Sequence, residues 1–443
     1  MIMTKMKNDS TFFTQAPLML FLVYIALLNT PFLYSIFLQF LLLFLIILFS
    51  IISGLCKFSK YPKKGKIGKI YFVFFIVVLI SVILSLVLQG FDFDYHKNTY
   101  IDLFTYFLFG LVLITIKIRK SNIRKIFRVL LVIGFIYSCS VYFQYFYNDV
   151  YNSIFLRLFD ISDQVEILNL SRNGVYNGIT NQTAHTAGII LFSIFIIISD
   201  YHVGKKILFS SLMFLFFLMF ALLLTGKRAH IVFGLIAVIF LSIFSKKGIQ
   251  RYKALFIWVI VILFLIASLY LFVNIFSNQT SGIFIVINNL YRTIFNDGSH
   301  DILSGREILY QQAVNNFFKS PIIGNGWRYF YNNSVGLLPG GGRSNVHNIY
   351  LQLLSDVGII GFLSFLSLIV TIFNFSYRQF IKVHNDGFIK KIITFSLLIQ
   401  TFYILYGFTG NGLSDYNYFA MYLLSVIFII FTSKYLDKER NTV

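Results

Sequence analysis

Long apolar runs alternate with short clusters of Lys and Arg over most of the chain. Each run holds about 18–22 residues, enough for a helix to cross a hydrocarbon layer roughly 30 Å thick. Because lipid offers no partner to unpaired backbone groups, such runs must be helical. The pattern therefore predicts an all-α polytopic membrane protein with twelve spans, over residues 13–30, 33–56, 70–89, 99–116, 129–147, 185–203, 207–224, 230–245, 254–276, 352–376, 392–408 and 417–433.

The distribution of charge predicts how these spans are oriented. Only 12% of the residues are charged, against about a quarter in soluble domains. The net charge of +20 would suit nucleic acid, but 27 of the 37 Lys and Arg lie in the N-terminal tail and in loops at alternate ends of the spans. The positive-inside rule makes these loops and both termini cytoplasmic. Their expected partner is the anionic inner leaflet, and no nucleic acid is expected.

The outer face then carries a medium loop over 148–184 and a long loop over 277–351. We divide the chain into spans one to five (1–147), spans six to nine (148–276), the long outer loop (277–351) and spans ten to twelve (352–443). A loop of this length is a candidate for function. No Lys, Arg, Asp, Glu or His lies near the middle of a predicted span, which argues against an ion-coupled carrier.

Lys227 and Arg228 interrupt the positive-inside pattern, because they stand together in the short outer loop over 225–229. One interpretation is a pair of side chains that snorkel to lipid phosphates. The other is a fixed anion site at the membrane surface.

The long outer loop contains an amphipathic segment. Ser304 and Glu307 have capping-box spacing, and apolar residues recur every four positions after them, which predicts a helix over about 305–319 that ends before Pro321. Arg306 lies in its first turn, where free N–H groups and the helix dipole favour an anion, although a solvated surface arginine is the common alternative. The Gly-rich run over 324–344 predicts a mobile loop that opens for a bulky substrate.

A helix is predicted to begin near Asn345 and to continue into the tenth span, which places His347 at its outer end. A single histidine at a helix start is often structural, but Arg343 and Asn348 share its face of the membrane. Asp415 lies in the short loop over 409–416, and three roles are open for it. It orients a histidine, binds a sugar hydroxyl, or caps the last helix.

Together these segments resemble the O-antigen ligase and polymerase superfamily of bacterial envelope glycan assembly. The resemblance rests on His347-Asn348-x-x-Leu351 with GIIG at 358–361, TGKRAH at 225–230, GREILY at 305–310 with SPIIGNG at 320–326, and GLSD at 412–415. By position, the essential arginines of the family correspond to Arg228 and Arg306, its histidine to His347 and its late aspartate to Asp415.

The resemblance implies a glycosyltransferase in the bacterial cytoplasmic membrane, with no metal and no cofactor. Its donor would be a polyprenyl-diphosphate-linked glycan on the extracytoplasmic face. Arginines suit the departing diphosphate through charge-assisted hydrogen bonds, and histidine suits proton transfer near neutral pH. We expect an inverting transfer in which His347 is the base and Arg228 and Arg306 hold the diphosphate. The expected substrate contacts are Lys227, Arg343, Asn348 and Asp415.

The resemblance favours a polymerase, because NQTAHTAG at 181–188 and TGKR at 225–228 are most similar to capsule and exopolysaccharide polymerases. A ligase that moves the finished glycan to a lipid A core or another acceptor is the alternative. Expected partners are the lipid-linked oligosaccharide, membrane lipids, and a chain-length regulator and flippase of the same pathway. A flippase function itself would require polar residues along the spans and symmetry between halves, and the sequence has neither.

Overall fold

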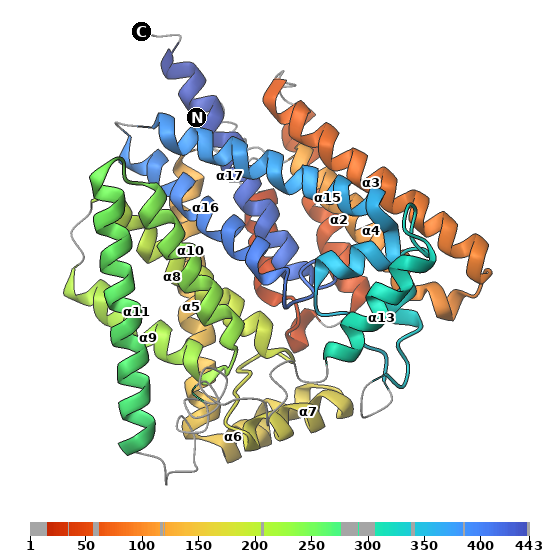
Figure 1. Ribbon diagram of the computed structural model, residues 1–443, viewed down its shortest axis with the longest axis horizontal. Coiled ribbons are helices and arrows are strands. Elements are labelled where there is room, and N and C mark those ends of the chain that lie inside the picture. Colours follow the sequence, from red (N-terminus) through yellow and green to blue (C-terminus); the bar gives the residue numbers. More distant parts are fainter. Residues whose placement is uncertain are drawn as a thin grey trace, which may run out of the picture.

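A computed structural model describes residues 16–33, 35–55, 62–115, 118, 120–204, 208–275, 291, 306–337, 342–383 and 386–440. These residues form helices joined by turns (Figure 1). In chain order, after a helix over Ala16–Leu27, they are η1 (Pro31–Leu33), α2 (Ile36–Leu55), α3 (Pro62–Gln89), α4 (Phe93–Thr115), α5 (Lys120–Phe146), α6 (Asn148–Ile154), η2 (Leu156–Leu158), α7 (Ile161–Arg172), α8 (Thr183–His202), α9 (Phe209–Leu224), α10 (Arg228–Phe244), α11 (Ile249–Ile275), α13 (Arg306–Lys319), α14 (Tyr329–Asn332), α15 (Ile349–Lys382), α16 (Gly387–Tyr406) and α17 (Tyr416–Arg440).

The predicted all-helical class is confirmed for the described residues. Within the described part of the chain, seven helices are long and apolar enough to cross a membrane: α3, α5, α8, α11, α15, α16 and α17. Four more are apolar but shorter: Ala16–Leu27, Ile36–Ile52, α9 and α10. Each predicted apolar run coincides with a helix, and the arrangement of twelve spans stays a prediction.

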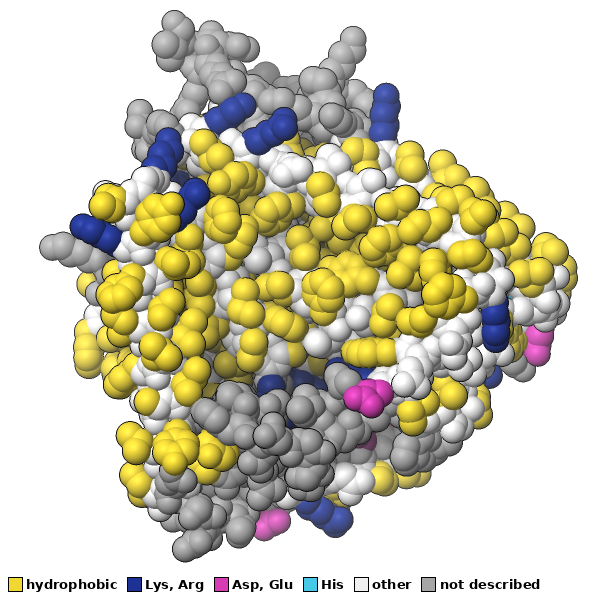
Figure 2. Space-filling model, in the orientation of Figure 1, with side chains coloured by type: hydrophobic (Ala, Val, Ile, Leu, Met, Phe, Trp, Pro, Cys, Tyr) yellow, Lys and Arg dark blue, Asp and Glu magenta, His cyan; other side chains and the backbone are white. Residues whose placement is uncertain are grey.

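The helices differ in how deeply they are packed. Most side chains of α8, α16 and α17 are buried, whereas no described residue in the apolar window of α11, at the edge of the bundle, is buried (Figure 1). Figure 2 shows a broad band of hydrophobic side chains across one face, with a group of Lys and Arg above it, further Lys and Arg at its right and lower edges, and the visible Asp and Glu in the lower half. This is the surface expected of a protein whose middle faces lipid.

The two ends of the bundle are built differently. At the basic end, ion pairs tie α16 and its preceding turn to other helices: Lys120 to Asp386 at 2.7 Å and Lys391 to Asp200 at 2.5 Å. The short helices α6 and α7 and the amphipathic helix α13 lie toward the opposite end (Figure 1). Polar segments that are far apart in sequence therefore meet at that opposite end.

Two features of the outer segments differ from the sequence-based expectations. The segment over 148–184 contains α6, η2 and α7 rather than a simple loop. Part of the Gly-rich run is anchored, because Trp327, Arg328 and Phe330 are buried. The amphipathic helix over 306–319 agrees with its prediction, and Ser304 of the capping box lies outside the described residues.

A kink in α15 holds the segment before α14 in place. Gly358 has φ 65° and ψ −167°, which interrupts the helical ladder. The freed backbone groups pair with the segment over 320–326: Ile359 N donates to Pro321 O at 2.9 Å, and Gly326 N donates to Asp356 O at 2.8 Å. A Cβ at position 358 would lie 2.5 Å from Ile322 O, so only glycine fits.

Candidate active site between the outer loops

Four segments meet at the end of the bundle opposite the basic end. They are the turn between α9 and α10, the start of α13, the residues before α15, and the turn over 409–415 between α16 and α17. The 409–415 turn holds two of the others. Its Thr409 carbonyl accepts a hydrogen bond from Arg306 Nη1 at 3.0 Å, and its Asn411 Oδ1 accepts one from His347 N at 3.0 Å. This turn therefore brings the predicted arginine and histidine together.

The backbone at His347 is in the left-handed region, with φ 57°. For a residue other than glycine this conformation costs about 1–2 kcal/mol, so neighbouring contacts must stabilise it. Helix α15 begins at Ile349, later than predicted, because the Asn348 side chain caps it by accepting from Tyr350 N and Leu351 N. His347 thus lies outside the helix, in a bend that turns its ring toward the 409–415 turn.

The Asn411 side chain also contacts the imidazole ring, since its Nδ2 lies 3.1 Å from His347 Nδ1. The backbone N–H of His347 can only donate, so the amide atom that faces it must be the oxygen. The amide nitrogen then faces Nδ1, and an amide nitrogen can only donate. Nδ1 must accept, which places the proton of the neutral ring on Nε2.

The charges around His347 oppose its protonation. Burial, together with the positive charges of Arg306 and Lys227, lowers the pKa of His347 to about 4. Burial and the charge of Arg306 also lower the pKa of Lys227, against the attraction of Asp415 and of Glu166 on α7. Two cations and one neutral N–H donor therefore share this site, a combination that suits an anion.

Asp415 lies at the edge of this cluster, immediately before α17. Its backbone N–H donates to Asn411 O at 2.8 Å. Burial raises the pKa of its carboxyl to about 7, and the charges of Lys227 and Arg328 oppose that rise. The side chain that orients His347 is Asn411, so the predicted orienting role does not fall to Asp415.

The remaining predicted residues lie around the cluster rather than within it. Arg228 is the first residue of α10 and has an exposed side chain. In the turn between α9 and α10, it is the charge of Lys227 that acts on His347. Arg343 is exposed, and its charge acts on the Tyr95 hydroxyl. Asn348 contributes its carbonyl oxygen to the α15 cap.

Sequence reasoning missed a buried ion pair next to Asp415. Asp102 on α4 binds Arg328 in two places, Oδ2 to Nε at 2.6 Å and Oδ1 to Nη2 at 2.8 Å. Trp327 Nε1 donates to the same carboxylate at 2.9 Å, and so does the hydroxyl of Tyr416. Burial alone would lower the pKa of Arg328, but the Asp102 carboxylate raises it. The one signal in the sequence was an acidic residue inside the outer part of an apolar run.

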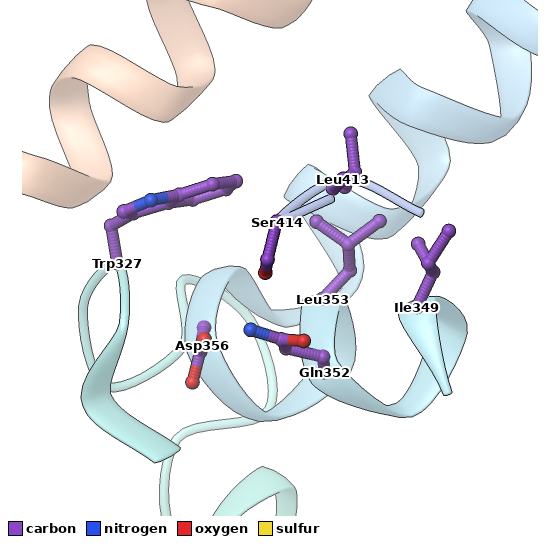
Figure 3. A pocket seen from close by; sticks show the side chains of 7 residues that line it. All are labelled: Trp327, Ile349, Gln352, Leu353, Asp356, Leu413 and Ser414. Carbon is purple, nitrogen blue, oxygen red and sulfur yellow. The ribbon is translucent and has the colours of Figure 1, made fainter. Parts of the chain in front are cut away.

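A narrow pocket adjoins the cluster (Figure 3). In Figure 3 the polar ends of Gln352, Asp356 and Ser414 lie between the Trp327 indole and the apolar side chains of Ile349, Leu353 and Leu413. Ile349 and Ser414 are close neighbours in sequence of His347 and Asp415. The pocket therefore lies near the polar site.

Comparison with curated proteins gave no significant match. A comparison with protein families did: the model described as O-antigen ligase matches residues 212–366. The matched segment runs from α9 through α13 into α15 and contains Lys227, Arg228, Arg306 and His347. Asp415 and Asn411 lie beyond it. The all-helical fold and the family match agree, and the similarity of residues 212–366 to the O-antigen ligase family supports the resemblance to the O-antigen ligase and polymerase superfamily.

Proposed function

We propose that this protein is an integral membrane glycosyltransferase that joins polyprenyl-diphosphate-linked oligosaccharide repeat units into a surface polysaccharide. The observation that carries the proposal is the meeting of Arg306 and His347 on the 409–415 turn, where the charge of Lys227 also acts on His347. A diphosphate is the leaving group of such a transfer, and it departs with a negative charge. Preorganised cations and N–H donors stabilise that charge as it develops.

The donor would enter with its diphosphate against Arg306 and Lys227. Arg228, exposed at the first turn of α10, would meet the same group from the open side. The acceptor hydroxyl would attack the anomeric carbon opposite the diphosphate, which inverts the configuration. Because the cations stabilise the leaving group, the proposed reaction needs no metal, and EDTA should leave the rate unchanged.

The residues that line the neighbouring narrow pocket are of the kinds that contact sugars. The pocket offers one aromatic ring together with a carboxyl, an amide and a hydroxyl group, the combination that positions polar ligands. We place the acceptor sugar on this side of the cluster. Arg343 and Asn348 keep their expected role as contacts to the outer parts of the glycan.

We place the protein in the bacterial cytoplasmic membrane with twelve spans and both termini in the cytoplasm. The group of Lys and Arg above the hydrophobic band, where no Asp or Glu is visible, supports this orientation (Figure 2). The proposed site then faces outward, where a flippase would deliver the lipid-linked unit. A chain-length regulator would be a further partner.

Polymerase and ligase share this chemistry and differ in acceptor. The test is to reconstitute the purified protein in liposomes with the lipid-linked repeat unit as the only glycan and to resolve the products by size. A ladder of repeat lengths supports the polymerase. Transfer only after a lipid A core or another acceptor is added supports the ligase. Movement of intact donor across the bilayer without transfer would overturn both and support a flippase.

A further inference from the structure

The hydrogen bonds of His347 bear on which group accepts a proton in the reaction. We propose that Asn411 fixes His347 as an Nε2–H donor to the leaving diphosphate, and that the Asp415 carboxylate, not the imidazole, takes the proton of the acceptor hydroxyl. This inference rests on the proposed glycosyl transfer, and it departs from the sequence-based expectation that His347 is the base.

Nδ1 of His347 already accepts a hydrogen bond from Asn411. A neutral imidazole that acts as a base accepts a proton on its unprotonated nitrogen. In His347 that nitrogen is Nδ1, which already accepts from Asn411 Nδ2 at 3.1 Å. The amide cannot rotate to present its oxygen, because Asn411 Oδ1 is held by His347 N at 3.0 Å. A proton on Nδ1 would face an N–H group, so the contact disfavours imidazolium.

Nε2 is the ring nitrogen of His347 that does not face Asn411. Nε2–H is a donor in a site that Arg306 and Lys227 make positive. A neutral donor among two cations can bind a phosphate oxygen and gains nothing from holding a second proton. His347 therefore belongs with the cations that stabilise the leaving group.

The proton of the acceptor hydroxyl must then move to a group other than His347. Asp415 is joined to the same unit, since its N–H donates to Asn411 O at 2.8 Å and Lys227 acts on both Asp415 and His347. The groups that act on its carboxyl are Lys227 and Arg328, and the hydroxyls of Tyr403, Tyr406 and Tyr418 interact with its charge. A carboxyl whose pKa burial raises to about 7 is suited to proton transfer near neutral pH.

The proposed transfer forms one bond and breaks another. The acceptor oxygen forms a bond to the anomeric carbon while the bond from that carbon to the diphosphate oxygen breaks. The electron pair of the broken bond stays on the diphosphate, which Arg306, Lys227 and His347 Nε2–H stabilise. The acceptor proton moves to the ionised Asp415 carboxylate and later passes to water.

The tautomer of His347 can be measured without any glycosyl transfer. In protein labelled with ¹⁵N-histidine, one of the seven histidine signal pairs should disappear in His347→Gln and thereby be assigned. At pH 7 we expect Nδ1 of His347 to be unprotonated and Nε2 protonated, with the reverse in Asn411→Asp, whose carboxylate can only accept. A protonated Nδ1 in the native protein would overturn the inference, whether or not the protein transfers sugar.

The second test uses the liposome assay with the lipid-linked repeat unit. The amide nitrogen of Gln reaches the place of Nε2, whereas that of Asn reaches only the place of Nδ1. We expect His347→Gln to retain at least about tenfold more activity than His347→Asn or His347→Ala, since it restores the donor. Equal loss in all three variants, beside an active native protein, would restore the role of His347 as base and leave the proposed function standing. No transfer by the native protein would count against the proposed function alone.

Asp415 is tested by the shape of the pH profile. Asp415→Asn should lose about 10²–10⁴-fold in rate, the contribution of a general base. Asp415→Glu should retain a pH-dependent rate with a shifted midpoint. If Asp415→Asn keeps the native profile, the proton goes elsewhere and this part of the inference is wrong.

Discussion

The Asn411 side chain binds His347 at two points, the backbone N–H at 3.0 Å and the ring Nδ1 at 3.1 Å. One amide thus stabilises a strained backbone and selects a tautomer. The two residues come from turns before α15 and before α17, so the packing of α15, α16 and α17 determines the geometry of the site.

Replacing Asn411 by Ala removes both contacts. The strained backbone of His347 then loses its support, and Nδ1 loses its donor. Since an unsatisfied buried polar group costs about 1–3 kcal/mol, we expect at least a tenfold loss of transfer rate. The global fold should survive, because Asn411 lies in a turn. An unchanged rate in the liposome assay would show that the amide does not hold the ring.

Arg306 should be essential for the diphosphate. Arg306→Gln removes a cation and the hydrogen bond to Thr409 O, and we expect the rate to fall about 10²–10³-fold, as for the loss of one oxyanion donor. Lys319→Gln is the matched control, because Lys319 is an exposed cation at the other end of α13. Polyprenyl diphosphate alone should inhibit the native protein and the control at similar concentrations, and Arg306→Gln more weakly. Equal inhibition of all three would contradict the role.

The transfer rate should rise with pH through about 7. A base must be ionised, and the pKa of the Asp415 carboxyl is raised to about 7, so about a tenth of it is ionised at pH 6 and about nine tenths at pH 8. His347, whose pKa is lowered to about 4, stays neutral over this whole window. If His347 were the base instead, the rate would be flat down to about pH 5. Initial rates between pH 5 and 8 separate the two results.

The Asp102–Arg328 pair should be the largest electrostatic contribution to stability near the site. Asp102→Ala leaves a buried guanidinium without its carboxylate, a change that costs about 3–5 kcal/mol. The melting temperature in detergent should fall by several degrees. The double variant Asp102→Ala with Arg328→Met should recover part of this loss, because no unpaired charge remains. A double variant less stable than Asp102→Ala would refute this account of the pair.

The kink in α15 should tolerate only glycine. In Gly358→Ala the new Cβ would meet Ile322 O at 2.5 Å and Gly324 N at 2.6 Å, and the left-handed backbone would be strained. We expect a destabilisation of at least about 2 kcal/mol, from strain and overpacking together. Gly342→Ala is the control, since its Cβ would meet no atom within 4 Å. Equal melting temperatures for the two variants would argue against the packing described for the kink.

Much of the fold could be predicted from the sequence, because lipid forces apolar runs into helices. The start of α15 was placed too early because the cap depends on the Asn348 side chain, and Asn345 has a side chain of the same type. The helices in 148–184 were missed because they are short and only partly apolar. Their stability comes from packing, such as the burial of Tyr151 and Ile167, which hydropathy does not report.

The site could be predicted only in part. Motif resemblance singled out Arg306, His347 and Asp415, and the structure brings them together. Asn411 was not singled out, because an asparagine in a Gly-rich turn suggests turn geometry, and its contact with His347 spans 64 residues. Asp102 and Arg328 are 226 residues apart, and no local pattern connects them.

The most direct test of the central claim is the rate at which the native protein, reconstituted alone in liposomes, cleaves the bond between sugar and diphosphate in the lipid-linked repeat unit. His347→Ala should be measured beside it. We predict that the native protein releases polyprenyl diphosphate in step with growth of the glycan, and that His347→Ala does so at least about 10²-fold more slowly. Release at the same rate in both proteins, or no release by the native protein, would contradict the account.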